Sequence, residues 1–432
     1  MSRKFEKDIL NLKFQNEISL QVLAQFEGVG LDRDQLRKLQ HKLPILYPWN
    51  KGYQLYRNNY NRRFTYFPMA IVRCHSTLHV QQSLQFVQTY KLQFTIRSGA
   101  HCYLAFSLST GIIIDLFEMD TIKVVCNKES RENATEIRSD KHVILGPGAR
   151  LGVVMQKLSR FGISIPTGSC INVAVSGLSL GGGISPSLIR LGGLMSDHLI
   201  AVKMVLANGK LIQVDKDNHP DLFFAVRGAG GSNFGIITEF VFNPCRFNGA
   251  VVFTIQYPWS QFRQIMNMWQ NFAPFTDRRL STEMDIYPPK FSPAGELPVQ
   301  FKGQFEGSIA ELTLLIKPFL EAAAQADEIK GDCSKAAPAE KTSVSIKAIK
   351  TFAESGRFFG KTRQAYFENN SIFWQNLLSG KALDVYAHHL EHAPGLGSSI
   401  EFNAMRGAVE DVSPEQTAFP YRKSLFLSLI HI

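Results

Sequence analysis

Three glycine-rich segments carry the residue types that hold a phosphate-bearing ligand. The first spans residues 97–103 and reads R-S-G-A-H-C-Y between two apolar runs. Its small residues let backbone N–H groups converge on an anion, and Arg97 and Ser98 add donors suited to a pyrophosphate. The other two span residues 168–183 and 227–235. One such loop is common, but three within about 140 residues, each beside a predicted strand, indicate a large phosphate-bearing cofactor.

The second segment reads G-S-C-I-N-V-A-V-S-G and continues L-S-L-G-G-G up to Gly183. Successive glycines are entropically costly, and they are typical of places where another group presses against bare backbone. Gly181, Gly182 and Gly183 are therefore candidate ligand contacts. The third segment, R-G-A-G-G-S-N-F-G, opens into an apolar run that contains Ile237.

Other cofactor and metal motifs find less support. Residues 146–152, G-P-G-A-R-L-G, follow a predicted strand, but Leu151 takes the place of the third glycine of the dinucleotide fingerprint. The P-loop pattern is absent, so nucleotide triphosphate hydrolysis loses its main support. Residues 388–392, H-H-L-E-H, match the inverted zinc-peptidase pattern. Because Pro394 follows closely and no third ligand is evident, a polar helix end is the favoured interpretation.

Short apolar runs with glycine punctuation predict an α+β unit around the three segments. Strands are predicted at residues 92–96, 111–116, 142–145 and 235–242. A hairpin over residues 201–214 turns at Asn208-Gly209. Helices are predicted after Gly148 and over residues 221–226. These elements place each glycine-rich segment at the end of a strand.

After Cys245 glycines become rare, which indicates a second unit. Strands over residues 251–257 and 299–305 and one amphipathic helix over residues 309–326 predict a further α+β arrangement. We therefore expect an N-terminal segment, a first unit and a second unit at residues 1–65, 66–243 and 244–432. A ligand cleft between the two units is the default expectation.

The composition fits a folded protein with sizeable cores, since hydrophobic residues make up 45% of 432. Lys and Arg number 47 against 37 Asp and Glu, which gives +10. Charged residues are only 19% and form no basic block, so nucleic-acid binding does not follow. No run of 18 apolar residues exists, which excludes an ordinary membrane-spanning helix. Charged residues interrupt the first twenty positions, so we do not expect a secretory signal. We therefore expect a cytoplasmic location.

The ordered motifs resemble one family. R-S-G-A-H-C-Y, then G-S-C-x-x-V-x-x-S-G-x-x-L-G-G-G, then N-G-K-L and D-L-F-F-A-V-R-G-A-G-G-S-N-F-G-I-I-T are similar to FAD-linked oxidases of the berberine bridge enzyme type. The resemblance covers residues 49–242, continues weakly afterwards and returns in A-F-P-Y-R at residues 418–422. It implies an α+β fold, with a two-lobed FAD-binding domain of the PCMH or vanillyl-alcohol-oxidase type followed by an α+β substrate domain.

The resemblance also implies how the cofactor is held. His101 matches the histidine that bonds to the 8α-methyl carbon of the flavin, and Cys170 matches the cysteine that bonds to flavin C6. We therefore expect bicovalent FAD. Val173 matches a position that influences oxygen access, and a small aliphatic residue there resembles the oxygen-using members. The residues assigned to cofactor binding are Arg97, Ser98, Gly99, Ala100, His101, Cys102, Gly168, Cys170, Val173, Gly177, Gly181, Gly182, Gly183 and Ile237.

Several positions depart from the family pattern. Ala100 and Ala105 stand where glycine is common, and alanine adopts positive φ less easily, so the geometry of the attachment loop is in question. Cys102 stands where serine is common, and Ser185 follows the glycine run where a further glycine is usual. Relatives also continue beyond A-F-P-x-R, whereas the sequence stops ten residues after Arg422, so we expect a truncated C-terminus that lacks a return segment to the FAD lobe.

The expected function is an FAD-dependent oxidase that removes a hydride from a C–OH or activated C–H of a sugar, alcohol or alkaloid-like molecule. Dioxygen is the expected electron acceptor. Two alternatives stay open: a dehydrogenase of the same fold that uses another acceptor, and a non-catalytic flavin-binding protein. Asn58, Asn59 and Asn61 either contact the cofactor or turn the chain, and we favour the turn. The sequence does not identify the catalytic base.

Overall fold

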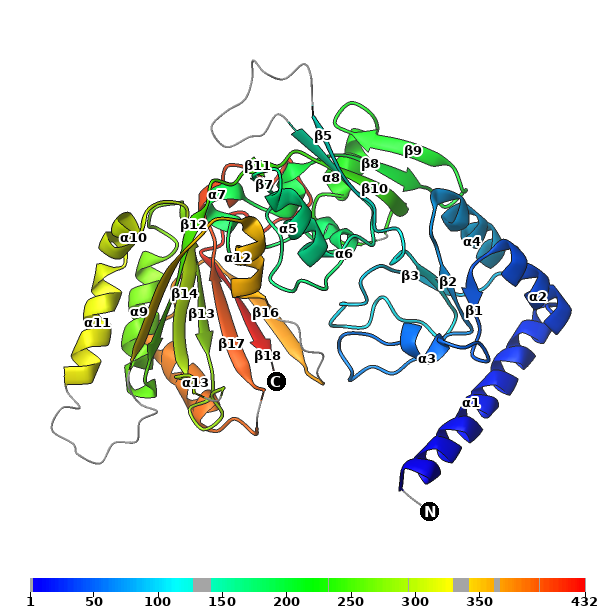
Figure 1. The fold of residues 1–432 in the computed structure, drawn as a ribbon, viewed down its shortest axis with the longest axis horizontal. Coiled ribbons are helices and arrows are strands. Elements are labelled where there is room, and N and C mark those ends of the chain that lie inside the picture. Colours follow the sequence, from blue (N-terminus) through cyan, green and yellow to red (C-terminus); the bar gives the residue numbers. More distant parts are fainter. Residues whose placement is uncertain are drawn as a thin grey trace.

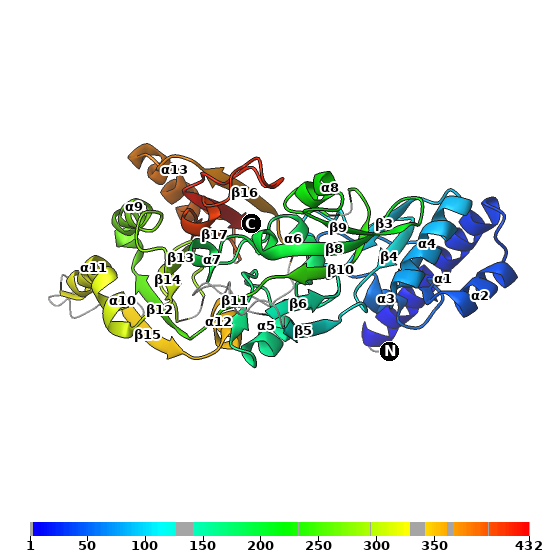
Figure 2. The ribbon, with the colours of Figure 1, turned by 90° about the horizontal axis from the view of Figure 1, so that it is seen from above.

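Three sheets of four, five and seven strands follow one another along the chain (Figure 1). The computed structural model describes residues 3–126, 141–231, 233–293, 295–328, 342–360, 366–395 and 397–431. The four-stranded and seven-stranded sheets lie at opposite ends of the molecule, and the five-stranded sheet lies between them (Figure 2). No helix in the described part of the chain is long and apolar enough to cross a membrane.

The first sheet has the order β1-β2-β4-β3. Its strands are β1 (Ile45–Leu46), β2 (Ala70–Arg73), β3 (Phe94–Arg97) and β4 (Ile112–Asp115). Strands β2, β3 and β4 are parallel, and buried parallel strands read as continuous apolar runs, as I-I-I does in β4. The helices of this lobe are α1 (Arg3–Gly28), α2 (Arg33–Lys42), α3 (Tyr53–Tyr56) and α4 (Thr77–Thr89).

The second sheet is antiparallel, with the order β5-β6-β10-β8-β9. Its strands are β5 (Ile122–Cys126), β6 (Lys141–Leu145), β8 (Leu199–Val205), β9 (Leu211–Asp215) and β10 (Ile236–Phe242). The surrounding helices are α5 (Leu151–Ser159), α6 (Val175–Leu180), α7 (Ile189–Gly192) and α8 (Pro220–Ala225). A small ladder pairs β7 (Ile163–Ser164) with β11 (Cys245–Arg246).

The third sheet has the order β15-β12-β14-β13-β17-β18-β16. Its strands are β12 (Ala250–Tyr257), β13 (Leu280–Ile286), β14 (Val299–Phe305), β15 (Ser343–Ile349), β16 (Asn369–Trp374), β17 (Ser399–Ala404) and β18 (Phe426–His431). The helices of this unit are α9 (Phe262–Phe272), α10 (Ile309–Leu315), α11 (Lys317–Glu328), α12 (Phe352–Phe359) and α13 (Gly380–Glu391).

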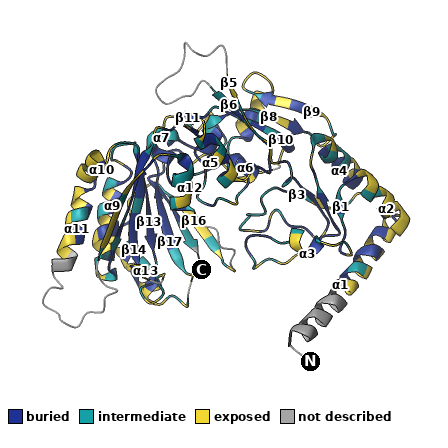
Figure 3. Ribbon diagram, in the orientation of Figure 1, coloured by how far each residue is buried: buried dark blue, intermediate teal, exposed yellow. Residues whose placement is uncertain are grey.

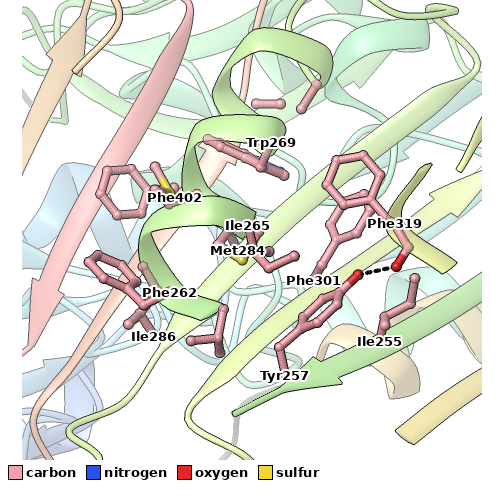
Figure 4. Close-up of a cluster of buried hydrophobic side chains, with 14 of the residues drawn as sticks. Ile255, Tyr257, Phe262, Ile265, Trp269, Met284, Ile286, Phe301, Phe319 and Phe402 are labelled. Atoms are coloured by element: carbon pink, nitrogen blue, oxygen red, sulfur yellow. Dashed lines mark hydrogen bonds between the residues drawn. The ribbon is translucent and has the colours of Figure 1, made fainter. Parts of the chain in front are cut away.

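One face of the third sheet forms the largest hydrophobic cluster with α9, α11 and α13. Trp269 and Ile265 of α9 pack on the strands, and the Tyr257 hydroxyl donates to the Phe319 carbonyl at 2.8 Å (Figure 4). Figure 3 shows the strands buried and the outer sides of the helices exposed. Because the three helices cover only this face, the opposite face is left to line the interior of the molecule.

The predicted elements are largely confirmed. The strands at 299–305 and the hairpin that turns at Asn208-Gly209 lie where the sequence places them. The single helix expected over residues 309–326 is wrong, because the structure ends α10 at Leu315 and begins α11 at Lys317. Pro318 lacks an N–H, and its ring would clash with the carbonyl of Leu314 in a continuous helix.

Candidate active site

The segment that carries His101 is held from outside by residues 59–61. The Tyr60 ring stacks on the His101 imidazole, with centroids 4.2 Å apart and planes at 22°. The Tyr60 N–H donates to the Ala100 carbonyl at 2.8 Å, and Asn59 Nδ2 donates to the Cys102 carbonyl at 2.9 Å. These contacts join parts of the chain about forty residues apart, so they fix the orientation of the imidazole.

Asn61 connects this loop to the third sheet. Its Nδ2 donates to the Tyr103 carbonyl at 3.0 Å and to the Phe367 carbonyl at 2.9 Å. Phe367 lies two residues before β16, and its ring meets Tyr60 and Tyr103 edge-on. The interpretation of Asn59 and Asn61 as simple turn residues is therefore incomplete, because both also bind the backbone of the His101 loop.

His101 has the electrostatics of a neutral nucleophile. The residue is half-buried, and its Nδ1 atom is buried with no hydrogen-bond partner among the described residues. Burial lowers the pKa of His101 to about 4, because a partly desolvated imidazolium is disfavoured. At neutral pH the ring is uncharged and keeps a lone pair.

The alanines of this loop do take the conformation that the sequence put in question. Ala100 has φ +54° and Ala105 has φ +63°. An L-residue pays about 1–2 kcal/mol for this region, because Cβ crowds the following carbonyl. The loop therefore adopts these two conformations at a cost in strain.

Arg97 and Ser98 also hold the loop against its neighbours. The Arg97 guanidinium is buried, forms an ion pair with Asp115 and donates to the Tyr56 carbonyl at 2.6 Å. The Ser98 hydroxyl donates to the Pro147 carbonyl at 2.6 Å. Arg97 Nη1 is buried and has no hydrogen-bond partner among the described residues. The binding of a pyrophosphate by these two residues stays a prediction.

The segment that carries Cys170 lies directly against the His101 loop. A Cβ on Gly99 would come within 2.6 Å of the Ala174 backbone nitrogen, so only glycine permits this approach. Cys170 itself is 8% exposed. The backbone around it is tied to the start of α5, with Leu151 N–H donating to the Val173 carbonyl and Gly152 N–H to the Ile171 carbonyl, each at 2.9 Å. The structure thus brings the two predicted attachment segments together.

The glycine run after α6 makes room for protein side chains. Gly182 and Gly183 have φ +107° and +81°. An added Cβ would meet the Phe419 ring at 2.7 Å and Met195 Cβ at 2.5 Å, respectively. The groups that lie against this backbone at the Cβ positions of Gly182 and Gly183 are Phe419 and Met195. Ligand contact at these two positions stays a prediction.

The surroundings of the other residues assigned to cofactor binding do less to explain why these residue types are needed. Gly177 has nothing within 4 Å of its Cβ position, and Gly168 and Gly181 have only ordinary van der Waals contacts. Ile237 is buried among the hydrophobic residues of the second sheet. In the third glycine-rich segment, Gly228 lies against the backbone of Phe419, while Ser232 falls outside the described residues.

The A-F-P-Y-R motif joins the glycine run to the third sheet. Phe419 packs with Ile189, Met405 and Leu427. Arg422 is buried and forms an ion pair with Asp197 at 2.7 Å. The sequence motif supports the family resemblance, but it predicts no role for Phe419 or Arg422. The residues next to them in the chain do not show that both side chains contact residues 182–197.

A cavity of about 360 Å³ opens beside the His101 loop. One wall comes from residues just after His101 and the other from the edge strand β16. The lining residues are Cys102, Tyr103, Leu104, Phe106, Asn369, Asn370 and Ser371. Cys102 is the one assigned cofactor residue that lines it. A small molecule in this cavity would lie next to the loop that carries His101.

The zinc-peptidase pattern forms no metal site in the described residues. α13 ends at Glu391, and the Glu391 carboxylate accepts a hydrogen bond from Trp259 Nε1 at 2.8 Å. Within the described chain, the group of potential metal ligands close enough to share an ion is Glu283, Asp285 and Glu401, on the third sheet. The interpretation of residues 388–392 as a polar helix end is consistent with this arrangement.

The residues present fit FAD as the ligand of this site. The unpartnered Nδ1 of His101 and the sulfur of Cys170 lie on adjoining loops, and each is a nucleophile suited to a covalent link. The fold around them, two α+β lobes followed by a sheet covered with helices on one face, is that of the PCMH-type FAD-binding proteins.

Comparison with known proteins identifies the family. Residues 68–215 match the FAD binding domain family. An uncharacterized FAD-linked oxidoreductase of Bacillus subtilis (strain 168), YgaK, is 35% identical over 374 residues, which is 85% of this chain and 76% of the relative. The chain therefore belongs to the FAD-linked oxidoreductases, and within them to the berberine bridge enzyme type.

Solved structures confirm the fold. The BBE-like 1 protein of Physcomitrella patens superposes with a TM-score of 0.76 at 22% identity, over 90% of this chain and 80% of that chain. The glucooligosaccharide oxidase of Acremonium strictum, which has a 6-S-cysteinyl, 8α-N1-histidyl FAD, superposes with a TM-score of 0.74 at 21% identity, over 91% of this chain and 80% of that chain.

Proposed function

We propose that this protein is a flavin oxidase whose FAD is attached both to His101 and to Cys170. The observation that carries the proposal is the adjacency of the two segments through Gly99 and Ala174, together with the buried, unpartnered Nδ1 of His101. The cysteinyl and histidyl links named for the glucooligosaccharide oxidase support the same chemistry.

The chain's own residues prepare each link. The lowered pKa keeps the His101 ring neutral, and Tyr60 holds the ring plane. The short hydrogen bonds between residues 151–152 and 171–173 fix the position of Cys170. Gly99 allows the two loops to approach each other closely. When bound, FAD supplies a two-electron acceptor that takes a hydride from the substrate.

The proposed substrate is a small molecule with an oxidisable C–OH or activated C–H, and the proposed electron acceptor is dioxygen. The cavity beside the His101 loop accommodates such a molecule. Val173, three residues after Cys170, supports oxygen use, because a small aliphatic residue at this position resembles the oxygen-using members of the family. Denaturation leaves covalent links intact, so attachment can be tested without knowing the substrate.

The attachment test uses protein expressed with ample riboflavin and precipitated with acid. The His101→Ala and Cys170→Ala variants should each retain flavin in the precipitate, and the double variant should release it. Release of all flavin from the wild-type protein on denaturation would refute covalent attachment. Asn58→Ala, which changes a neighbouring polar residue outside both loops, is the matched control and should retain flavin as the wild type does.

The oxygen test is separate. The holoenzyme is reduced with dithionite without oxygen and mixed with aerated buffer in a stopped-flow instrument. An oxidase should be reoxidised much faster than free reduced flavin, and Val173→Leu should slow this reaction without loss of attached flavin. Reoxidation no faster than that of free flavin would instead identify a dehydrogenase that uses another acceptor.

A further inference from the structure

A second cavity lies near the edge of the third sheet that is farther from the His101 loop. Its volume is about 470 Å³, and it forms where β12 begins, β14 and β15 end, and α10 begins. In the strand order, β12 lies five strand spacings from β16, which is about 24 Å. Because β16 lines the cavity beside the His101 loop, the two cavities are separate.

The lining of this second cavity combines apolar walls with one acidic side chain. Val251, Ile309 and Ile349 are among its apolar residues, and Asn248 adds a neutral amide. Among the described residues that line it, Glu306 alone has an ionisable side chain. A mostly apolar recess with few polar groups is typical of sites that bind small molecules.

The strand register shows which way Glu306 projects. Glu306 directly follows Phe305, whose ring lies in the core beneath the helices, and successive side chains alternate between the faces of a sheet. Phe305 is paired with Val251, so the same register continued by one residue places Glu306 beside Ala250. Ala250 and its partner Ile349 both line the cavity. The Glu306 side chain therefore projects to the side of the sheet on which these two residues line the cavity.

The Glu306 carboxyl group has no partner in the described part of the chain. The residue is half-buried, and no described cation or hydrogen-bond donor is paired with its side chain. Burial raises the pKa of Glu306 to about 7, because a carboxylate in a recess loses hydration. A ligand with a positive charge would replace the hydration that the ionised form loses.

The charged groups around the cavity leave this carboxyl group unpaired. They are Arg246, Arg279, Glu311, Lys347, Lys350 and Glu354. The Arg279 guanidinium is engaged elsewhere, since it donates to Asp277 at 2.7 Å and to Glu311 at 3.0 Å. Glu354 accepts a hydrogen bond from the Lys350 N–H at 2.9 Å. The side chains of Arg246, Lys347 and Lys350 belong to exposed residues, and burial is the sole cause of the raised pKa of Glu306.

We propose that this cavity binds a small molecule that carries an ammonium group on a short apolar chain, with Glu306 as the counterion. The carboxylate attracts the ammonium group more strongly in a recess than in open water, since the local dielectric is lower. The apolar walls stabilise the chain by removing its surface from water. The inference goes beyond the proposed function, because this site lies apart from the cavity beside the His101 loop.

The test compares two probes on the full chain by titration calorimetry at pH 8. One is n-butylammonium, and the other is butan-1-ol, which has the same chain and no charge. The ammonium probe should bind at least tenfold more tightly. Its affinity should fall about tenfold from pH 8 to pH 6, because a carboxyl group with a pKa of about 7 is mostly protonated at the lower pH. The affinity for butan-1-ol should not change.

Three variants separate charge from shape. Glu306→Gln should remove both the preference for the ammonium probe and the dependence on pH. Ala348→Leu adds a larger side chain to an exposed position that lines the cavity, so it should weaken the binding of both probes. Glu321→Gln, which changes an exposed carboxylate on α11, is the matched control and should bind both probes as the wild type does.

Equal affinity for the two probes, or binding of neither, would overturn the inference. The same holds if Glu306→Gln keeps the preference for n-butylammonium, or if the affinity is the same at pH 6 and pH 8. Acid precipitation of the same protein reports on flavin attachment independently. Retained flavin without binding of the ammonium probe therefore refutes this inference alone.

Discussion

Two partly buried histidines, His101 and His198, have opposite electrostatics. His101 has an unpartnered Nδ1, and burial lowers its pKa to about 4. Both ring nitrogens of His198 face carbonyl oxygens, Nδ1 that of Asn243 at 2.9 Å and Nε2 that of Gly192 at 2.7 Å. Burial also lowers the pKa of His198, but Cys245 and the two carbonyls outweigh it and raise the pKa to about 9.

The difference shows that partners, rather than burial, decide what a histidine does. A neutral imidazole has one N–H and can donate to only one of two carbonyls, whereas an imidazolium donates to both. The surroundings of His198 therefore favour a cation that ties the end of α7 to Asn243, directly after β10 of the second sheet. His101 lacks such acceptors, so its nitrogen stays available to form a bond.

The largest expected effect is on stability. His198→Ala leaves the Gly192 and Asn243 carbonyls without donors and should lower the free energy of unfolding by about 3 kcal/mol, with flavin attachment retained. His101→Ala removes mainly the stacking on Tyr60 and should cost about 1 kcal/mol. Urea denaturation measures both. Equal losses in the two variants would contradict the assigned roles.

Raising the pH tests the cationic state of His198. Its folded pKa of about 9 lies above the unfolded value, so its contribution is present at neutral pH and is lost as the pH rises through 9. The effect should be smaller than that of His198→Ala, because deprotonation removes one donor only. The melting temperature should fall as the pH rises from about 6.5, the unfolded value, to about 9 and should level off above that. The fall should be smaller in His198→Gln and should end at lower pH in Cys245→Ser.

The next prediction concerns what holds the His101 loop. Asn59→Ala removes the bond to the Cys102 carbonyl and should cost about 1 kcal/mol. Peptide mass analysis should then show less flavin on His101, with the link to Cys170 unchanged. Asn58→Ala is the matched control, because its amide bonds within α3 to the Gln54 carbonyl. Equal loss of histidyl flavin in both variants would exclude a positioning role for Asn59.

The smallest effect should come from backbone strain. Ala100→Gly relieves a positive φ and should stabilise the protein by about 0.5–1 kcal/mol. Ala174→Gly, at φ −91° in the facing loop, should destabilise it by a similar amount, because glycine adds only unfolded-state freedom there. Melting temperatures that move in the same direction for both variants would show that Ala100 is not strained.

The sequence predicts local features of this molecule well. Apolar runs and turn signals locate most strands, and the order of the glycine-rich segments indicates the fold. It also raises the question about Ala100, which the positive φ resolves. These features depend on residues that are neighbours in the chain, so the residue types and their spacing in the sequence are enough to predict them.

Long-range placement could not be predicted in the same way. Three contacts join segments that are distant in the sequence. Arg97 forms an ion pair with Asp115, the Phe419 ring lies against Gly182, and the Tyr60 ring stacks on His101. The group of Glu283, Asp285 and Glu401 could not be predicted for the same reason, since these carboxylates become neighbours only when β13 and β17 pair.

The central claim is that one flavin links His101 to Cys170, and mass spectrometry of a tryptic digest tests it most directly. The two residues fall in separate tryptic peptides, 98–123 and 161–190. The account predicts a single species that contains both peptides and one FAD. Recovery of both peptides without added flavin mass, from protein made with ample riboflavin, would contradict it.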